Sequence, residues 1–214
     1  MPLLFQKNIN STCALAVWHI TEPKEELLLH FHENFIEQQK DTRTNAANAQ
    51  HYLASRAILL SLFPKQKIEL IKDKFNKPKL FLNNIPQHIS ITHSHEYAAI
   101  IFSADQSLGI DLEKIDQRIT RVKNKFMNEN ELEFAGENEL ITAQTLIWSA
   151  KETLYKLYGT KGLDFKQDLH IAPFQAKNLG SLTCKISKIS NNQNFLVQYE
   201  TIENYVLTYI CQNQ

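Results

Sequence analysis

Two carboxylates in the stretch Gly109 to Glu113 (GIDLE) stand at a spacing that suits chemistry on a phosphate. In an extended strand, Asp111 and Glu113 project from one face and Ile110 and Leu112 from the other. The two Cα atoms would lie about 7 Å apart, so both carboxylates can hold one hard divalent cation such as Mg²⁺, which prefers oxygen ligands. A short strand with a solvated polar face explains the same alternation, and spacing alone leaves both interpretations open.

A second charged pair, Glu152 and Lys156, lies one helical turn apart in an amphipathic stretch. On an exposed helix such a pair contributes only a few tenths of a kcal/mol. In a site, Glu152 would be a third metal carboxylate or a general base, and Lys156 would face a phosphate. Trp148, one turn before Glu152 on the same ridge, would be poorly placed on a wholly solvated face.

Two further stretches give weaker signals. His93 and His95 end a β-type run; a His-x-His pair can bind zinc, but ordinary turn residues explain it as well. The stretch Lys72 to Lys79 holds four lysines in eight residues, which suits either a solvated loop or a phosphate-rich ligand.

The elements that must position these residues follow from hydrophobic periodicity. The expected order is strand 13–20, helices 22–37 and 45–63, β-type runs within 67–103, strand 108–113, helices 121–134 and 143–158, and strands 184–189, 195–199 and 205–211. Helices followed by strands thus occur twice. This predicts an α+β fold of two packed halves, residues 1–104 and 105–214, each a small antiparallel sheet packed with helices.

Composition narrows the class of protein. Among 214 residues, Lys plus Arg and Asp plus Glu each total 23, so no overall field favours nucleic acid or an anionic membrane. The three cysteines are widely spaced and form no C-x-x-C pair, which argues against a disulfide framework and fits a reducing cytoplasm. The sequence shows neither a signal peptide nor an apolar run of about 20 residues. We therefore expect a soluble cytoplasmic protein.

Five ordered segments together resemble the phosphopantetheinyl transferase superfamily, specifically its larger surfactin-synthetase-activating type. They are Asn76-Lys77-Pro78, Ile91 to His95, Gly109 to Glu113, Phe126 to Glu131, and Trp148 to Lys156. Asn76 and His95 stand where the family usually has glycine. At about twice the length of the smaller acyl-carrier-protein synthase branch, the chain fits the internally duplicated form, so a monomer with its active site in the cleft between the lobes is expected.

The resemblance implies a role for each matching position in the second lobe. Asp111, Glu113 and Glu152 would hold Mg²⁺ against the pyrophosphate of coenzyme A, and Lys156 would neutralise that pyrophosphate. Glu131 would help to activate the incoming serine hydroxyl, and whether Glu131 or Glu152 is the general base stays open.

In the first lobe the resemblance implies a grip on the nucleotide of coenzyme A. His93 would meet its 3'-phosphate end, and Lys77 and Pro78 would line the adenine side. Thr92 and Arg56 complete the expected binding residues. Ala47 stands where a phosphate-binding arginine is often found, and Arg43 or Lys40 would take its place.

The implied reaction is transfer of the 4'-phosphopantetheine group of coenzyme A to a serine of an apo acyl, polyketide or peptidyl carrier protein, with release of 3',5'-ADP. Two alternatives remain. One is a coenzyme A or nucleotide binding module without catalysis, and the other is a phosphohydrolase that uses the same carboxylates and metal.

Overall fold

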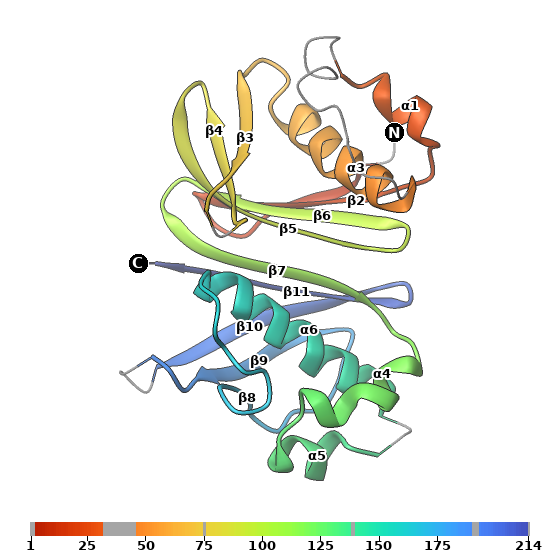
Figure 1. The fold of residues 1–214 in the computed structure, drawn as a ribbon, viewed down its shortest axis with the longest axis vertical. Helices are drawn as coiled ribbons and strands as arrows, with labels where there is room; N and C mark the ends of the chain where they lie inside the picture. The colour runs from red at the N-terminus through yellow and green to blue at the C-terminus, as the bar shows by residue number, and fades with distance from the viewer. Residues whose placement is uncertain (1–2, 32–45, 75, 138–139, 190–192, 214) are drawn as a thin grey trace. The chain divides into compact units, whose positions relative to one another are not determined.

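The computed structural model describes residues 3–31, 46–74, 76–137, 140–189 and 193–213. The chain divides into two compact units, Met1–Gln106 and Ser107–Asn213. Each unit has a sheet and helices of its own (Figure 1), which confirms the predicted α+β class.

The first unit is built on a six-stranded antiparallel sheet of order β1-β2-β6-β5-β4-β3. Its strands are β1 (Leu3–Asn8), β2 (Cys13–His19), β3 (Ile68–Lys72), β4 (Pro78–Leu82), β5 (Ile85–Ser94) and β6 (Tyr97–Ser103). The central strand β2 is buried from Cys13 to Trp18, which explains why its sequence reads as one apolar run.

Helix α3 (Ala46–Leu62) supplies most of the helical core of this unit and packs on β2 and β6, with α1 (Lys24–Leu28) beside it. Buried small residues such as Ala54 and Ala57 let the helix approach the sheet closely. The helix predicted over 22–37 is shorter than expected where it is described, because α1 ends at Leu28. Lys40 and Arg43 lie outside the described residues.

The second unit has a five-stranded sheet of order β7-β11-β10-β9-β8. Its strands are β7 (Gln106–Lys114), β8 (Leu169–Ile171), β9 (Leu179–Ile186), β10 (Asn194–Ile202) and β11 (Tyr205–Asn213). Helix α6 (Ile141–Tyr158) packs on β11 and buries its apolar stripe, with Leu146, Ile147, Ala150 and Leu154 all fully buried. It ends at Gly159, whose φ of 73° is the left-handed conformation that glycine favours after a helix.

The single helix predicted over 121–134 is wrong. The structure has α4 (Arg118–Val122), the 3₁₀ turn η1 (Lys123–Lys125) and α5 (Glu129–Ala135) instead. The break falls at Asn128, whose side chain accepts a hydrogen bond from the backbone N–H of Glu131, while the Glu131 carboxylate accepts from the backbone N–H of Asn128. This capping box starts a new helix. The short strands β1 and β8 were also not predicted.

Across the described ranges, no helix combines the length and the apolar character needed to cross a membrane.

Candidate active site

Strand β7 and helix α6 bring the predicted metal carboxylates together in the second unit. The strand runs so close to the helix that a Cβ atom added at Gly109 would lie 2.1 Å from the backbone oxygen of Thr153. Only glycine fits there without moving the backbone. The contact places Asp111, two residues further along the strand, against the side chains of α6.

Asp111 is 4% exposed and is held through both carboxylate oxygens. Its Oδ1 accepts a hydrogen bond from Lys156 Nζ at 2.7 Å, and its Oδ2 accepts one from Ser149 Oγ at 2.9 Å. Lys156 also donates to the carbonyl oxygen of Ile110, at 3.0 Å. The alternative of a solvated polar face on this strand is therefore wrong at Asp111.

Glu113 is held by Trp148, whose indole Nε1–H donates to Glu113 Oε1 at 3.0 Å. The indole is stacked on the ring of Phe165, with centroids 5.3 Å apart, and meets Phe126 edge-on at 5.2 Å. Burial, with the negative charge of Asp111 next, raises the pKa of Glu113 to about 7. Burial and Asp111, in the same order, also raise the pKa of Glu152.

Asp111 thus lies close enough to Glu113 and Glu152 to raise the proton affinity of both in a poorly solvated place. A bound cation would relieve this repulsion, and carboxylate oxygens are the ligands that Mg²⁺ prefers. Within the described part of the chain, however, no three His, Cys, Asp or Glu side chains converge as a ready ligand set. The donor set fits Mg²⁺ by its chemistry and charge.

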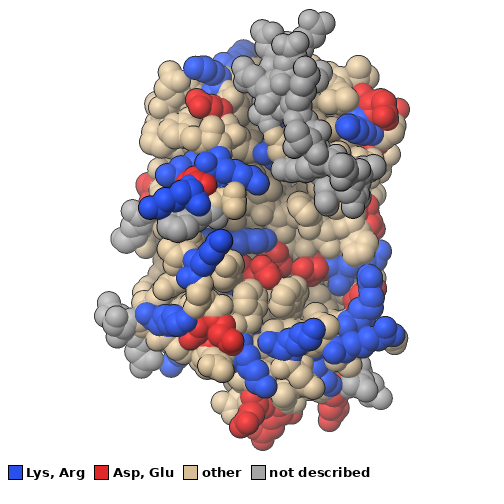
Figure 2. Space-filling view, in the orientation of Figure 1, with Lys and Arg blue, Asp and Glu red and all other residues tan. Residues whose placement is uncertain are grey.

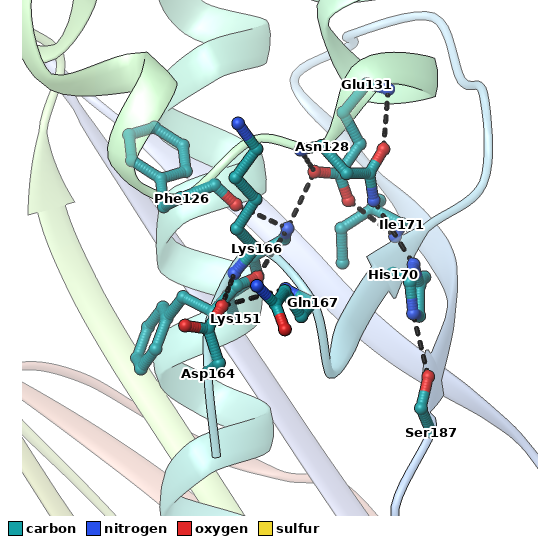
Figure 3. A network of polar contacts seen from close by, with 11 residues as sticks. Phe126, Asn128, Glu131, Lys151, Asp164, Lys166, Gln167, His170, Ile171 and Ser187 are labelled. Carbon is teal, nitrogen blue, oxygen red and sulfur yellow. Dashed lines mark hydrogen bonds and ion pairs between the residues drawn. The ribbon is translucent and has the colours of Figure 1, made fainter.

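Glu131 lies elsewhere, in a buried network of the same unit (Figure 3). Its Oε2 accepts hydrogen bonds from Lys151 Nζ at 2.6 Å and from the backbone N–H of Asn128, and its Oε1 accepts from the N–H of Ile171 at 2.9 Å. The side chain is fully buried. This arrangement ties α5 to α6 and β8, so it favours a structural role for Glu131 over contact with an incoming hydroxyl.

Lys151 is a residue that the sequence analysis missed. Its ammonium is fully buried and donates to Glu131 and to the carbonyl oxygens of Phe126 and Phe165, at 2.7 and 2.9 Å. Burial lowers the pKa of Lys151, and the charge of Glu131 opposes that shift. The signal was its position four residues after Ile147, inside the apolar stripe of α6, where a charged residue needs a buried partner.

The first unit holds a pocket of about 220 Å³ between α3, β3, β5 and the turn before β4. Three of the predicted binding residues line it: Arg56, Pro78 and His93. Thr92 is not among the lining residues, because strand alternation turns it to the opposite face, where it is 5% exposed. Lys77 is not among them either; burial lowers its pKa, and the charge of Asp73 opposes the shift.

Flat side chains form part of the wall of this pocket. The ring of His51 is stacked on that of His93, with centroids 4.3 Å apart, and the Arg56 guanidinium lies 3.5 Å from the ring centroid of Tyr52. His51 and Tyr52 were not predicted. The spacing of Tyr52 and Arg56, four residues apart on one helix, was the available signal.

The sequence of the second unit also matches a known family. Residues 107–210 match the family model of the 4'-phosphopantetheinyl transferase superfamily. This match covers just under half of the chain. The 4'-phosphopantetheinyl transferase gsp of Aneurinibacillus migulanus is 28% identical over 103 residues, which are 47% of this chain and 41% of that protein. The alignment thus spans less than half of that relative's length, and the resemblance inferred from the motifs is confirmed.

Two departures from the superfamily pattern have a backbone explanation. Asn76 and His95, which stand where glycine is usual, have φ angles of 66° and 48°. These left-handed conformations favour glycine, but asparagine and histidine are among the side chains that adopt them most readily. The turns before β4 and after β5 therefore keep a glycine-type backbone, which leaves Asn76 and His93 in place beside the pocket.

Surface charge in this chain is mixed. On the face shown in Figure 2, basic and acidic side chains are interspersed. This agrees with equal totals of 23 for each sign.

Proposed function

We propose that this chain transfers the 4'-phosphopantetheine group of coenzyme A to a serine hydroxyl of an apo acyl, polyketide or peptidyl carrier protein. The observation that carries the proposal is the meeting of Asp111, Glu113, Glu152 and Lys156 at one poorly solvated place on β7 and α6. A pair on a solvated helix face would show neither the burial nor the raised pKa values. The superfamily match of the same residues supports this chemistry.

In this proposal Asp111, Glu113 and Glu152 hold Mg²⁺, and Lys156 presents its ammonium to the pyrophosphate of coenzyme A. When bound, Mg²⁺ supplies positive charge to the phosphoryl oxygens. Lys156 adds a charge-assisted hydrogen bond that strengthens as the leaving group gains negative charge. Because Lys156 is anchored to Asp111 and Ile110, its ammonium is positioned before substrate binds.

Glu152 is the better candidate for the general base. Its side chain is only partly buried, so its carboxylate is accessible to an incoming hydroxyl. Glu131 is fully buried, with hydrogen bonds to both oxygens. The serine oxygen would bond to the β-phosphorus, its proton would pass to Glu152, and the bond between that phosphorus and 3',5'-ADP would break.

The pocket of the first unit supplies a site of suitable chemistry for the nucleotide of coenzyme A. Its histidine and tyrosine rings offer flat surfaces for adenine, and Arg56 offers a cation for a phosphate. The active site in a cleft between two lobes, the monomeric state and the cytoplasmic location stay predictions, as do the roles of residues 1–104 and 105–214.

Release of 3',5'-ADP tests the proposal against its two alternatives. The chain is incubated with coenzyme A and Mg²⁺, with and without an apo carrier protein. Release that requires the carrier supports transfer. Release without carrier indicates a phosphohydrolase, and binding of coenzyme A without any release indicates a binding module.

A further inference from the structure

Three buried hydroxyl groups form a chain that ends on Asp111. Ser149 and Thr153 come from α6, and Thr208 comes from β11; all three side chains are fully buried. The Oγ1 atoms of Thr153 and Thr208 lie 2.7 Å apart, Thr208 Oγ1 lies 2.8 Å from Ser149 Oγ, and Ser149 Oγ lies 2.9 Å from Asp111 Oδ2.

The number of available protons determines the direction of each hydrogen bond between these hydroxyls and Asp111. Each hydroxyl has one hydrogen to donate, and a carboxylate can only accept. Ser149 must therefore donate to Asp111, which leaves Thr208 to donate to Ser149 and Thr153 to donate to Thr208. Thr153 Oγ1 also lies 3.2 Å from the Thr208 carbonyl oxygen and can share its hydrogen with it. Every hydroxyl thus points its donor toward the carboxylate.

We propose that Thr208 is a positioning residue for the metal carboxylate Asp111. It acts through Ser149: the Thr208 hydroxyl holds the Ser149 oxygen, so that the Ser149 hydrogen stays aimed at Asp111 Oδ2. Lys156 holds the other oxygen. Both carboxylate oxygens are then fixed in orientation. This inference rests on the proposed function, since it assigns a role toward the Mg²⁺ that Asp111 would hold.

The burial of the chain makes its effect substantial. Hydrogen bonds in series polarise one another, and in a poorly solvated interior this strengthens the final bond to the carboxylate. A valine at 208 would keep the shape of the side chain but would leave the Ser149 oxygen without its donor. Hydrogen bonds that orient metal ligands in this way typically change metal affinity by about 10- to 100-fold.

The test is a Mn²⁺ titration of the full chain, with free Mn²⁺ measured by electron paramagnetic resonance. We expect Thr208→Val to weaken Mn²⁺ binding by about tenfold or more, and Thr208→Ser, which keeps the hydroxyl, to bind within about threefold of wild type. Thr145→Val is the matched control: Thr145 is a buried threonine of α6 whose hydroxyl donates to the Ile141 carbonyl, away from Asp111. It should bind Mn²⁺ like wild type.

A double mutant separates positioning from packing. If Thr208 acts only through Ser149, Thr208→Val should weaken Mn²⁺ binding no further in a Ser149→Ala background. Additive losses, or wild-type affinity in Thr208→Val, would overturn the inference. Should Thr208→Val not fold, the affinities of Thr208→Ser and Ser149→Ala still decide: an intact Ser149→Ala affinity refutes it. A wild-type chain that binds no Mn²⁺ would contradict the proposed function itself and the inference with it.

Discussion

Lys156 Nζ lies 2.7 Å from Asp111 Oδ1, an ion pair that joins the end of α6 to β7. The Lys156 side chain is 26% exposed and that of Asp111 is 5% exposed. The exposed helix pair with Glu152, which the sequence allowed, is therefore not the main environment of this lysine. Its ammonium sits at the carboxylate cluster.

Lys156→Ala should slow transfer by roughly a hundredfold or more, because it removes a charge that counts most in the transition state. Lys156→Arg should not restore full activity, since a planar guanidinium places its donors differently. Initial rates at saturating coenzyme A and Mg²⁺ are the measurement. The control is Lys161→Ala, an exposed lysine just beyond α6, which should behave like wild type. Equal rates for the two alanine variants would show that Lys156 has no part in transfer.

Trp148→Phe should raise the Mg²⁺ concentration for half-maximal activity by about tenfold, because the indole N–H that orients Glu113 is lost while a ring remains. The control is Trp18→Phe. Trp18 is buried in the first unit, and its Nε1 has no hydrogen-bond partner among the described residues. The measurement is the Mg²⁺ concentration for half-maximal activity of both variants. An equal change in the two would show that the indole N–H of Trp148 has no special role.

The local parts of this site were predictable from sequence because they depend on short-range periodicity. Strand alternation placed Asp111 and Glu113 on one face, and the apolar stripe placed α6. The capping box at Asn128 and Glu131 was also present in the sequence, as an asparagine three residues before a glutamate, but the helical pattern around it obscured the break.

The rest depends on contacts between distant segments. No local sequence pattern indicates that Lys151 pairs with Glu131, 20 residues earlier, or that Thr208 is hydrogen-bonded to Ser149, 59 residues earlier. Such pairings are set by how β11 and α5 pack on α6. The contacts that favour a structural role for Glu131 have the same origin.

Stability should depend on pH through Glu113. Its pKa is raised from 4.5 to about 7 by burial and by Asp111, so between these values the folded protein binds more protons than the unfolded chain. The contribution of Glu113 to the free energy of unfolding is therefore greatest below about pH 4.5, and it is lost as the pH rises through about 7. The melting temperature of wild type should fall between roughly pH 5.5 and roughly pH 8, two values on either side of this pKa. In Glu113→Gln this fall should be smaller.

Added Mg²⁺ should act in the opposite direction, because metal ligands must be deprotonated. It should raise the melting temperature of wild type more at the higher pH than at the lower, and this difference should shrink in Glu113→Gln. Glu133→Gln, at an exposed position of α5, is the control. If the melting temperature of Glu113→Gln depends on pH and on Mg²⁺ as that of wild type does, the proposed metal-binding role of Glu113 is contradicted.

Lys151→Met should destabilise the second unit by about 3–5 kcal/mol, since it leaves the Glu131 carboxylate buried without its partner. The double mutant Lys151→Met with Glu131→Gln should recover part of that loss. Urea unfolding gives both values. Lys188→Met removes a lysine from a partly exposed pair with Asp168 and should leave the unfolding midpoint nearly unchanged. A similarly mild effect at Lys151 would show that the buried pair contributes little.

The proposed role of the carboxylates on β7 and α6 in phosphopantetheine transfer is tested most directly by the intact mass of an apo carrier protein. Carrier, coenzyme A and Mg²⁺ are incubated with wild-type chain or with Asp111→Ala, whose folding is checked by a thermal melt. We expect wild type to add the mass of one phosphopantetheine group to the carrier serine and folded Asp111→Ala to add none. An unmodified carrier across acyl, polyketide and peptidyl types, or full modification by Asp111→Ala, would contradict it.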